Sequence, residues 1–280
     1  MKIPSSERRF LFNAFAQSVA GFLRRPETAI LNDEASQFLP EDGGRQNRSS
    51  KGYRGASGVV QFDSADTDLE GQRLHDGWYE TKVTATVEGI NVLDIFTVEK
   101  ARASMITRAS EDGDETEVRL GECFIKGLKI KGCECNVQTD TDLFNEVPTL
   151  RALEQRFESD ATFRQTARQR FLWHKLDDGA PEYVRKSFAW AGEQLERENR
   201  LPKLQGTAPC TIVKKLECDC PDVTVHGHTL RIPNFGRVFF GVLLASRGTR
   251  RLNMLQFDLG SPAEGQLSMD AVMGNGSFFP

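Results

Sequence analysis

Residues 80–109, ETKVTATVEGINVLDIFTVEKARASMITRA, decide the fold class. In the first third, Val83, Ala85 and Val87 alternate with polar residues, which is the period of a strand with one buried face. The middle third is more continuously apolar, and the last third alternates again. The stretch therefore predicts successive β-strands joined as antiparallel hairpins.

Similar patterns occur on both sides of a helical stretch. Residues 117–137 predict two further strands broken by glycines, and strands resume near residue 207. GRVFFGVLLAS, at 236–246, is apolar throughout, as expected for a centrally buried strand. The C-terminal residues 260–280 are rich in glycine and predict a tail with at most one short strand.

A helical insert is predicted over residues 147–205. Thr149 is a suitable N-cap, and Leu150, Leu153 and Phe157 follow at helical spacing. Further apolar stripes of the same period run to Pro202, which indicates two or three helices.

The N-terminus predicts an amphipathic helix over residues 5–25, stopped by Pro26. Its proposed apolar face consists of Phe12, Phe15, Val19, Phe22 and Leu23. We expect this face to dock on the protein's own core, and contact with a membrane surface or a partner is the alternative. Residues 31–57 are polar and predict a linker or arm.

Together these patterns predict an α+β protein. Its body is antiparallel, β-rich and sandwich-like, and carries the helical insert and the N-terminal amphipathic helix. The expected organisation is an N-terminal helix and polar arm (1–55), a first β block (56–146), the insert (147–205) and a second β block (206–280). The two β blocks are expected to pack as one domain.

The composition argues against several classes of partner. The 280-residue chain has a net charge of −4 and a pI near 5.7, so a nucleic-acid partner is not expected. It contains no apolar run of the ~18 residues that a transmembrane helix needs. Arg8–Arg9 and the apolar residues after them faintly resemble an export signal, but no convincing cleavage site follows. We therefore expect a cytoplasmic protein, with export as the alternative.

A metal site is the most specific chemical hypothesis. Residues 214–233, KKLECDCPDVTVHGHTLRIP, contain Cys-x-Cys followed by His-x-His. If residues 221–223 form a hairpin loop, two thiolates and two imidazoles converge on an ion, which is the ligand set that zinc prefers. The candidate zinc ligands are Cys218, Cys220, His226 and His228. The competing interpretation is a half-buried hairpin in which cysteine acts as a small apolar residue.

The six cysteines leave a second choice open. They form two similar sets, Cys123 with Cys133 and Cys135, and Cys210 with Cys218 and Cys220. In a reducing compartment the thiols stay free, which we expect here. In an exported protein, Cys133 and Cys135 would pair with Cys218 and Cys220 across neighbouring strands.

The sequence contains no recognisable set of catalytic residues. It has no Gly-x-Ser-x-Gly elbow and no glycine-rich phosphate-binding fingerprint, and neither His75 nor His228 is accompanied by a complete catalytic set. No catalytic residue and no cofactor is predicted, apart from the zinc alternative.

Residues 85–137 contain an Asn-Val strand, an Ala-alternating strand and a glycine-rich segment, GLKIKG. This layout resembles that of bacterial choice-of-anchor-type surface proteins. The resemblance implies a β-rich fold and a non-enzymatic role, and it implies no site residues.

The function expected from the sequence is non-enzymatic binding or assembly through protein surfaces, by a protein partner or by self-association. The exposed aromatic residues expected in GNGSFFP, at 274–280, favour it. A zinc-binding metalloprotein is the alternative.

Overall fold

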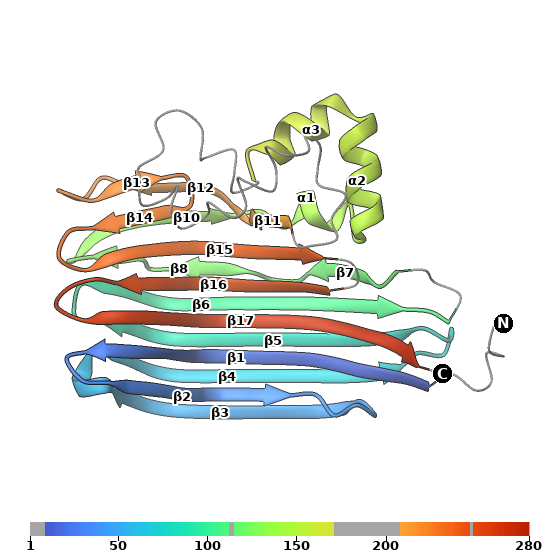
Figure 1. The fold of residues 1–280 in the computed structure, drawn as a ribbon, viewed down its shortest axis with the longest axis horizontal. Coiled ribbons are helices and arrows are strands. Elements are labelled where there is room, and N and C mark those ends of the chain that lie inside the picture. The colour runs from blue at the N-terminus through green and yellow to red at the C-terminus, as the bar shows by residue number, and fades with distance from the viewer. Residues whose placement is uncertain (1–8, 112–114, 171–207, 247–248, 280) are drawn as a thin grey trace.

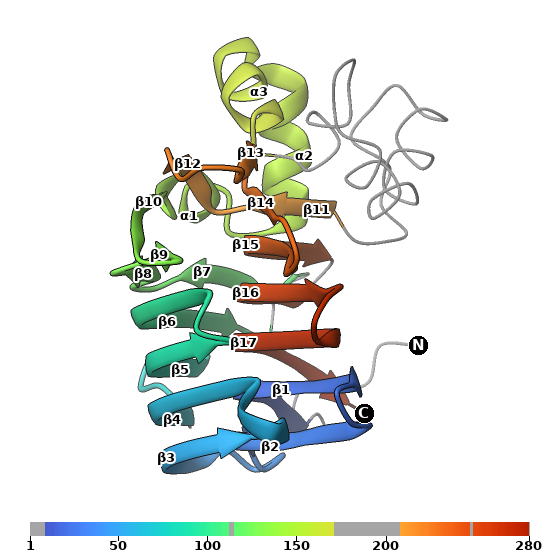
Figure 2. The same cartoon turned by 90° about the vertical axis from the view of Figure 1, so that its left-hand side faces the viewer.

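The protein is a sandwich of two antiparallel β-sheets, with helices at one end (Figures 1 and 2). The computed structural model describes residues 9–111, 115–170, 208–246 and 249–279. We call the sheet that contains the N-terminal strand sheet A and the other sheet B. None of the helices in these residues has the length and apolar character needed to span a bilayer.

Sheet A runs in the order β13-β14-β15-β16-β17-β1-β2, with β11 also pairing with β15. Its strands are β1 (Arg9–Arg25), β2 (Ala29–Phe38), β11 (Ala208–Thr211), β13 (Thr224–His226), β14 (Thr229–Ile232), β15 (Gly236–Ser246), β16 (Thr249–Leu259) and β17 (Glu264–Phe279).

Sheet B runs in the order β12-β10-β9-β6-β5-β4-β3, and β7 and β8 also pair with β6. Its strands are β3 (Gly44–Gly55), β4 (Val60–Arg73), β5 (Tyr79–Val92), β6 (Phe96–Ala109), β7 (Glu117–Leu120), β8 (Phe124–Lys126), β9 (Lys129–Ile130), β10 (Cys133–Thr139) and β12 (Val213–Cys218). A short 3-10 turn, η2 (Ala56–Gly58), leads from β3 to β4.

Helices α1 (Asp142–Asn145), α2 (Leu150–Ser159) and α3 (Ala161–Arg168) lie at the end of the sandwich furthest from β2 and β3 (Figure 1). The Thr149 side chain accepts a hydrogen bond from the Ala152 backbone N–H, as a helix cap does. Leu150, Leu153 and Phe157 are buried, as their spacing predicts. The third helix predicted from residues 180–200 lies outside the described residues.

The predicted β-rich body is confirmed. Val83, Ala85 and Val87 on β5 are fully buried, and the polar residues between them are more exposed. β15 lies between two neighbours in sheet A, and its apolar side chains are largely buried, as the unbroken pattern of its sequence predicts.

A transverse crease crosses sheet A at one level. In four successive ladders the pairing skips one residue on each strand, and the skipped residues form a row from β15 to β2. Three of them have a left-handed backbone, with φ of +56°, +52° and +48° on alternate strands. In strand order, the row is Gly241, Met254, Asp270, Ser18 and Ala35.

Sheet B contains a similar crease. The row runs from β3 to β6 and continues to Gly127, the residue after β8, and its three glycines have φ of +64° to +65°. In order, the row is Gly52, Asp63, Gly89, Glu99 and Gly127. A Cβ on Gly89 would lie 2.1 Å from an Asp63 carboxylate oxygen, and one on Gly127 would lie 2.3 Å from Glu99. Acidic side chains therefore lie directly over two of the glycines.

Each crease inverts the parity of its strands. Ordinary strands bury every second residue. At the crease one residue of each strand is unpaired, and beyond it the buried side chains fall on residue numbers of the opposite parity. On β17 the buried positions Leu267 and Met269 are followed by Val272 and Gly274. Each strand of a row therefore keeps its core face on both sides of the crease.

The predicted N-terminal helix is wrong, because residues 9–25 form β1 in the interior of sheet A. The crease at Ser18 explains the false signal. Phe12 faces the core before it, Val19 and Leu23 face the core after it, and Phe22 lies on the outer face. A parity change within a strand thus imitates helical spacing. The suggested membrane contact of residues 5–25 depended on an amphipathic helix, and residues 9–25 form a strand instead.

The predicted polar arm at 31–57 and the predicted C-terminal tail are also strands. β2 and β3 are edge strands. β3 has no buried residue, and β2 exposes the apolar Ile30 beside the buried Leu31, so neither sequence alternates clearly. β17 is 16 residues long and lies between β16 and β1. Its glycines mark crowding rather than a loop: a Cβ on Gly276 would lie 2.2 Å from the Phe10 ring, and one on Gly274 would lie 2.5 Å from Thr107.

Candidate functional site

Four cysteines meet where β10 pairs with β12. Side chains two apart on a strand share a face, so each Cys-x-Cys presents both sulfur atoms on one side of this two-stranded ribbon. Cys135 lies opposite Cys218, with their Cα atoms 4.4 Å apart, and these two form a disulfide. Cys133 and Cys220 form a second disulfide, with Cα atoms 5.8 Å apart.

The two disulfides touch each other. The Cys220 Sγ atom lies 3.3 Å from the Cys218 Sγ atom and 3.6 Å from the Cys135 Sγ atom. Cys218 and Cys220 are buried, whereas Cys133 and Cys135 are half-buried. We call these four residues the sulfur cluster.

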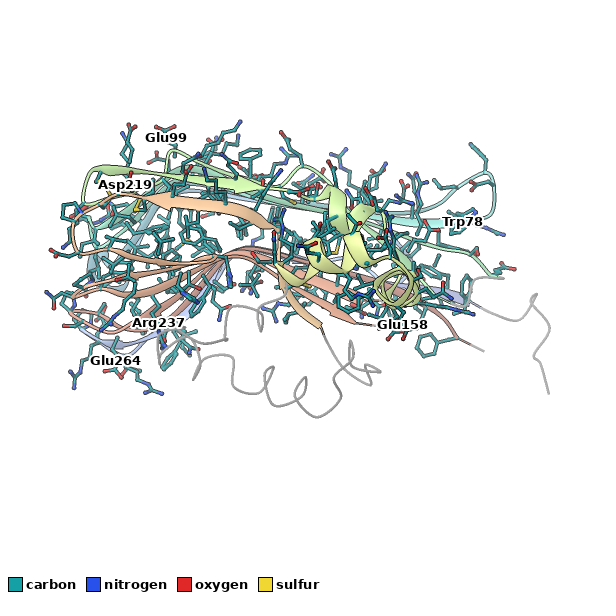
Figure 3. All side chains as sticks on the ribbon, turned by 90° about the horizontal axis from the view of Figure 1, so that it is seen from above. Trp78, Glu99, Glu158, Asp219, Arg237 and Glu264 are labelled. Carbon is teal, nitrogen blue, oxygen red and sulfur yellow. A yellow bond between two sulfur atoms is a disulfide. The ribbon has the colours of Figure 1, made fainter. Side chains whose placement is uncertain are left out.

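An acidic hollow of about 820 Å³ opens beside the sulfur cluster. Both Cys135 and Cys218 line it. Glu99 and Asp219 lie at the end of the molecule opposite Trp78 (Figure 3). Four carboxylates and one lysine provide the charged groups of the lining: Glu99, Glu134, Glu217, Asp219 and Lys129. The hollow therefore favours cations over anions.

The predicted Cys-x-Cys/His-x-His hairpin does not form. β12 pairs with β10 in sheet B, whereas β13 pairs with β14 in sheet A. The chain crosses between the sheets through the turn at Pro221–Asp222. His226 pairs with Thr229, so the tight turn falls at Gly227–His228.

The structure thus separates the four predicted ligands into two groups. Among the described residues, the one group of three close metal-ligating side chains is Cys135, Cys218 and Cys220, and it contains neither His226 nor His228. His228 is buried within sheet A.

Free thiols were expected at all six cysteines, and four of them instead form disulfides. The pairing is the one expected for an exported protein. The repeated spacing of Cys, a gap and Cys-x-Cys was the signal that linked Cys133 and Cys135 to the later pair. It did not show which strand would lie beside β12.

Cys123 and Cys210 are free and buried. Burial raises the pKa of the Cys123 thiol to about 11 and that of the Cys210 thiol to about 12. Since the thiolate is the reactive form, both thiols are poor nucleophiles at neutral pH.

We predict a stepwise thiol count for protein purified without reductant. At pH 8, Cys123 and Cys210 in the native protein should react with a thiol reagent at least about 100-fold more slowly than an exposed cysteine. Two thiols should react after denaturation, and six after denaturation with reductant. Rapid reaction of four or more thiols in the native protein would contradict the two disulfides.

Asp270 is an unusual group in the core. Its side chain is fully buried in the sheet A crease, and neither carboxylate oxygen has a hydrogen-bond partner among the described residues. Burial raises its pKa well above the usual range. Cys123, which lies just before β8 of the opposite sheet, is close to Asp270. An ionised Asp270 raises the Cys123 pKa further. No pattern in the sequence around Asp270 distinguished it.

Arg250 anchors the helical end of the molecule. Only 2% of this residue is exposed, and its guanidinium donates hydrogen bonds to the backbone carbonyls of Phe144, at 3.4 Å, and Val147, at 2.7 Å. Burial lowers the Arg250 pKa to about 10. The two carbonyl groups stabilise the buried guanidinium, and these hydrogen bonds connect β16 of sheet A to α1 and the segment after it.

Comparison with known proteins gives a family and no function. No curated protein and no solved structure matches the chain. The sequence model of one family, described as a domain of unknown function (DUF8256), matches residues 10–246. The match begins in β1 and ends at the last residue of β15, so it includes both strands of the sulfur cluster. With more than half of its length matched, the chain belongs to the DUF8256 family.

Proposed function

We propose that this protein is a non-enzymatic assembly module that self-associates through the sheet edges formed by β2 and β3. The observation that carries the proposal is the pair of free edges at one end of the sandwich (Figures 1 and 2). Among the described strands, β2 pairs only with β1 and β3 pairs only with β4. Both edges therefore offer backbone groups to another strand.

The two edges differ in charge. β3 carries four exposed basic residues and no acidic one, whereas the β2 sequence has two acidic residues and no basic one. Like charges on facing strands repel and opposite charges attract. Pairing of β2 with β3 of a second copy is thus favoured over pairing of β3 with itself. The basic residues are Arg45, Arg48, Lys51 and Arg54.

A two-fold axis parallel to the strands satisfies this rule for both copies. β3 follows β2 after a short connection and runs back along it, since the Arg48 guanidinium reaches the Ser36 carbonyl at 3.4 Å. Rotation about such an axis places β3 of the second copy antiparallel to β2 of the first. The same operation produces the reciprocal pair, as a two-fold interface requires.

Apolar side chains on the outer face of sheet A support this surface. Ile30 is 74% exposed and lies opposite Phe22 on β1, and Phe38 is 64% exposed and lies opposite Phe15. They are among the few large apolar side chains that the described residues expose, and three of the four such residues lie on β1 and β2. Covering them would add apolar burial to the strand pairing.

Two variants test the proposal by light scattering after size-exclusion chromatography. Wild-type protein should approach twice the monomer mass as its concentration rises. Ile30→Lys and Arg48→Glu should each weaken the dimer at least about tenfold, or about 1.4 kcal/mol, by removing apolar cover or placing like charges together. Higher salt should weaken it too.

Phe279→Lys and Lys126→Glu are the matched controls, because they make the same kinds of change on strands that do not border β2 or β3. They should leave the dimer intact. A monomer at the highest attainable concentration would refute self-association, and equal weakening by the controls would refute these edges as its site.

The disulfides favour the exported alternative for location. Structural disulfides persist in oxidising compartments and are rare in the cytosol. We therefore extend the proposal to an assembly protein that acts outside the reducing cytosol.

A further inference from the structure

The sulfur cluster has the donor set of a metal site that differs from the predicted one. We propose that Cys133, Cys135, Cys218 and Cys220 bind one zinc ion as a tetrathiolate when the protein is reduced. The two disulfides are then the oxidised state of the same four residues. Cys133 and Cys135 take the places that the sequence prediction gave to His226 and His228.

The first support is the close approach of the sulfur atoms of Cys135, Cys218 and Cys220, to which Cys133 is joined through its bond to Cys220. A disulfide requires each sulfur to have one sulfur neighbour, but Cys220 Sγ has three: its bonded partner on Cys133, and two others at 3.3 and 3.6 Å. Tetrahedral zinc with bonds of about 2.3 Å places neighbouring sulfur atoms about 3.8 Å apart. Once the disulfide bonds are broken, three of the four sulfur atoms are already close together, and rotation of the Cys133 side chain toward them completes the set.

The second support is the backbone that carries the cluster. Cys135 and Cys218 are directly paired, and a register shift occurs only at the far end of the ribbon, between Gln138 and Thr139. Both Cys-x-Cys pairs therefore stay on one face whether or not the sulfur atoms are bonded. The Cys135 backbone N–H also donates to the Leu128 carbonyl at 2.9 Å, which ties the ribbon to the turn before β9.

The third support is the environment. The acidic hollow leads directly to Cys135 and Cys218, so it attracts a divalent cation to the cluster. Cys218 and Cys220 are 8% and 7% exposed, which shields bound metal from competing water ligands. No residue of β10 is fully buried, so this strand gains stability from a cross-link of either kind to β12.

The conversion between the two states balances with a dithiol as reductant. Two dithiol molecules each supply two electrons and two protons, so that both disulfides become pairs of thiols and each dithiol becomes a disulfide. Zinc then replaces the four thiol protons, which are released to solvent. Oxidation by a disulfide reagent reverses the sequence and expels the ion.

The test compares reduced and oxidised full-length protein. Each form is incubated with equimolar Zn²⁺ and desalted, and its metal content is measured by plasma mass spectrometry. We expect one zinc per chain in the reduced form and none in the oxidised form. With Co²⁺ instead, the reduced form should show the sulfur-to-cobalt charge-transfer and intense red d–d bands of a tetrathiolate complex.

Paired variants identify the ligands while leaving one disulfide able to form. Cys133→Ser with Cys220→Ser, and Cys135→Ser with Cys218→Ser, should each abolish stoichiometric zinc in the reduced state. Each oxidised double variant serves as its own folding control by circular dichroism. His226→Ala is the matched control and should retain one zinc with an unchanged cobalt spectrum.

Absence of stoichiometric zinc from the reduced wild-type protein would overturn the proposal. So would loss of zinc in His226→Ala while a cysteine double variant keeps it, because that result would restore the histidine-containing set. The outcome is independent of self-association, since neither β10 nor β12 belongs to the β2 and β3 edges.

Discussion

Replacing Asp270 with asparagine is expected to stabilise the protein at neutral pH and to flatten the pH dependence of its stability. Burial raises the pKa of Asp270 in the folded state, while the unfolded chain ionises near the ordinary value of about 3.9. Above that pH the unfolded state releases a proton that the folded state keeps. The free energy of unfolding of the wild type therefore falls as pH rises.

The expected size follows from proton linkage. While Asp270 stays protonated in the fold and ionised in the unfolded chain, the wild type loses about 1.4 kcal/mol per pH unit relative to the asparagine variant. The loss begins near pH 4 and ends at the folded-state pKa. Asparagine has a similar shape and tolerates the left-handed φ of +52° at this position.

Denaturant titrations at pH 4, 5 and 6 measure the effect. Asp94→Asn is the control, because Asp94 is exposed and has nearly the same backbone conformation, with φ of +54°. That control should change the free energy of unfolding by no more than about 0.5 kcal/mol. Parallel pH profiles for wild type and Asp270→Asn would show that the carboxyl group has a partner that stabilises its charge.

Gly241→Ala is expected to cost about 2–4 kcal/mol of unfolding free energy. Gly241 lies in the sheet A crease with φ of +56°, where an L-residue is strained. Its added Cβ would also lie 2.7 Å from Ile212 Cγ1, and Ile212 is fully buried. Neither the backbone nor the packed side chain has room to yield without loss.

Gly52→Ala separates the two causes. Gly52 has φ of +64° in the sheet B crease, but a Cβ there would meet nothing within 4 Å. It should therefore show the strain alone, about 1–2 kcal/mol. Thermal or denaturant unfolding of both variants gives the comparison, and a cost for Gly241→Ala no greater than that for Gly52→Ala would argue against close packing at the crease.

Alternation of apolar residues predicted the interior strands well, because a half-buried strand has a period that tertiary contacts reinforce. β5 and β6 are examples. The same rule failed for β1, where the crease changes the parity at Ser18 and the two halves together imitate a helix. It also failed for β3, which has no buried residue and therefore no apolar period to detect. It failed for β2 as well, where the buried Leu31 and the exposed Ile30 are both apolar.

The candidate site was predicted in part. The spacing of Cys218 and Cys220 alone correctly predicted that their side chains point the same way, although Cys220 lies two residues beyond the end of β12. Their neighbour was not predicted, because the choice between β10 and β13 depends on a pairing between residues more than 80 positions apart. Local sequence favoured the histidines, which are near in the chain, over Cys133 and Cys135, which are near in space.

The paired creases also limit how a gene for this fold can change length. Deleting one codon from a strand in the crease row would shift half of that strand by one residue against both of its neighbours, so that its ladder pairs no longer match. No neighbouring strand can compensate alone, because the rows cross five strands of sheet A and four of sheet B. Length variation among relatives should thus be confined to connections, and the number of residues on either side of Gly89 and Asp270 should be fixed within each strand.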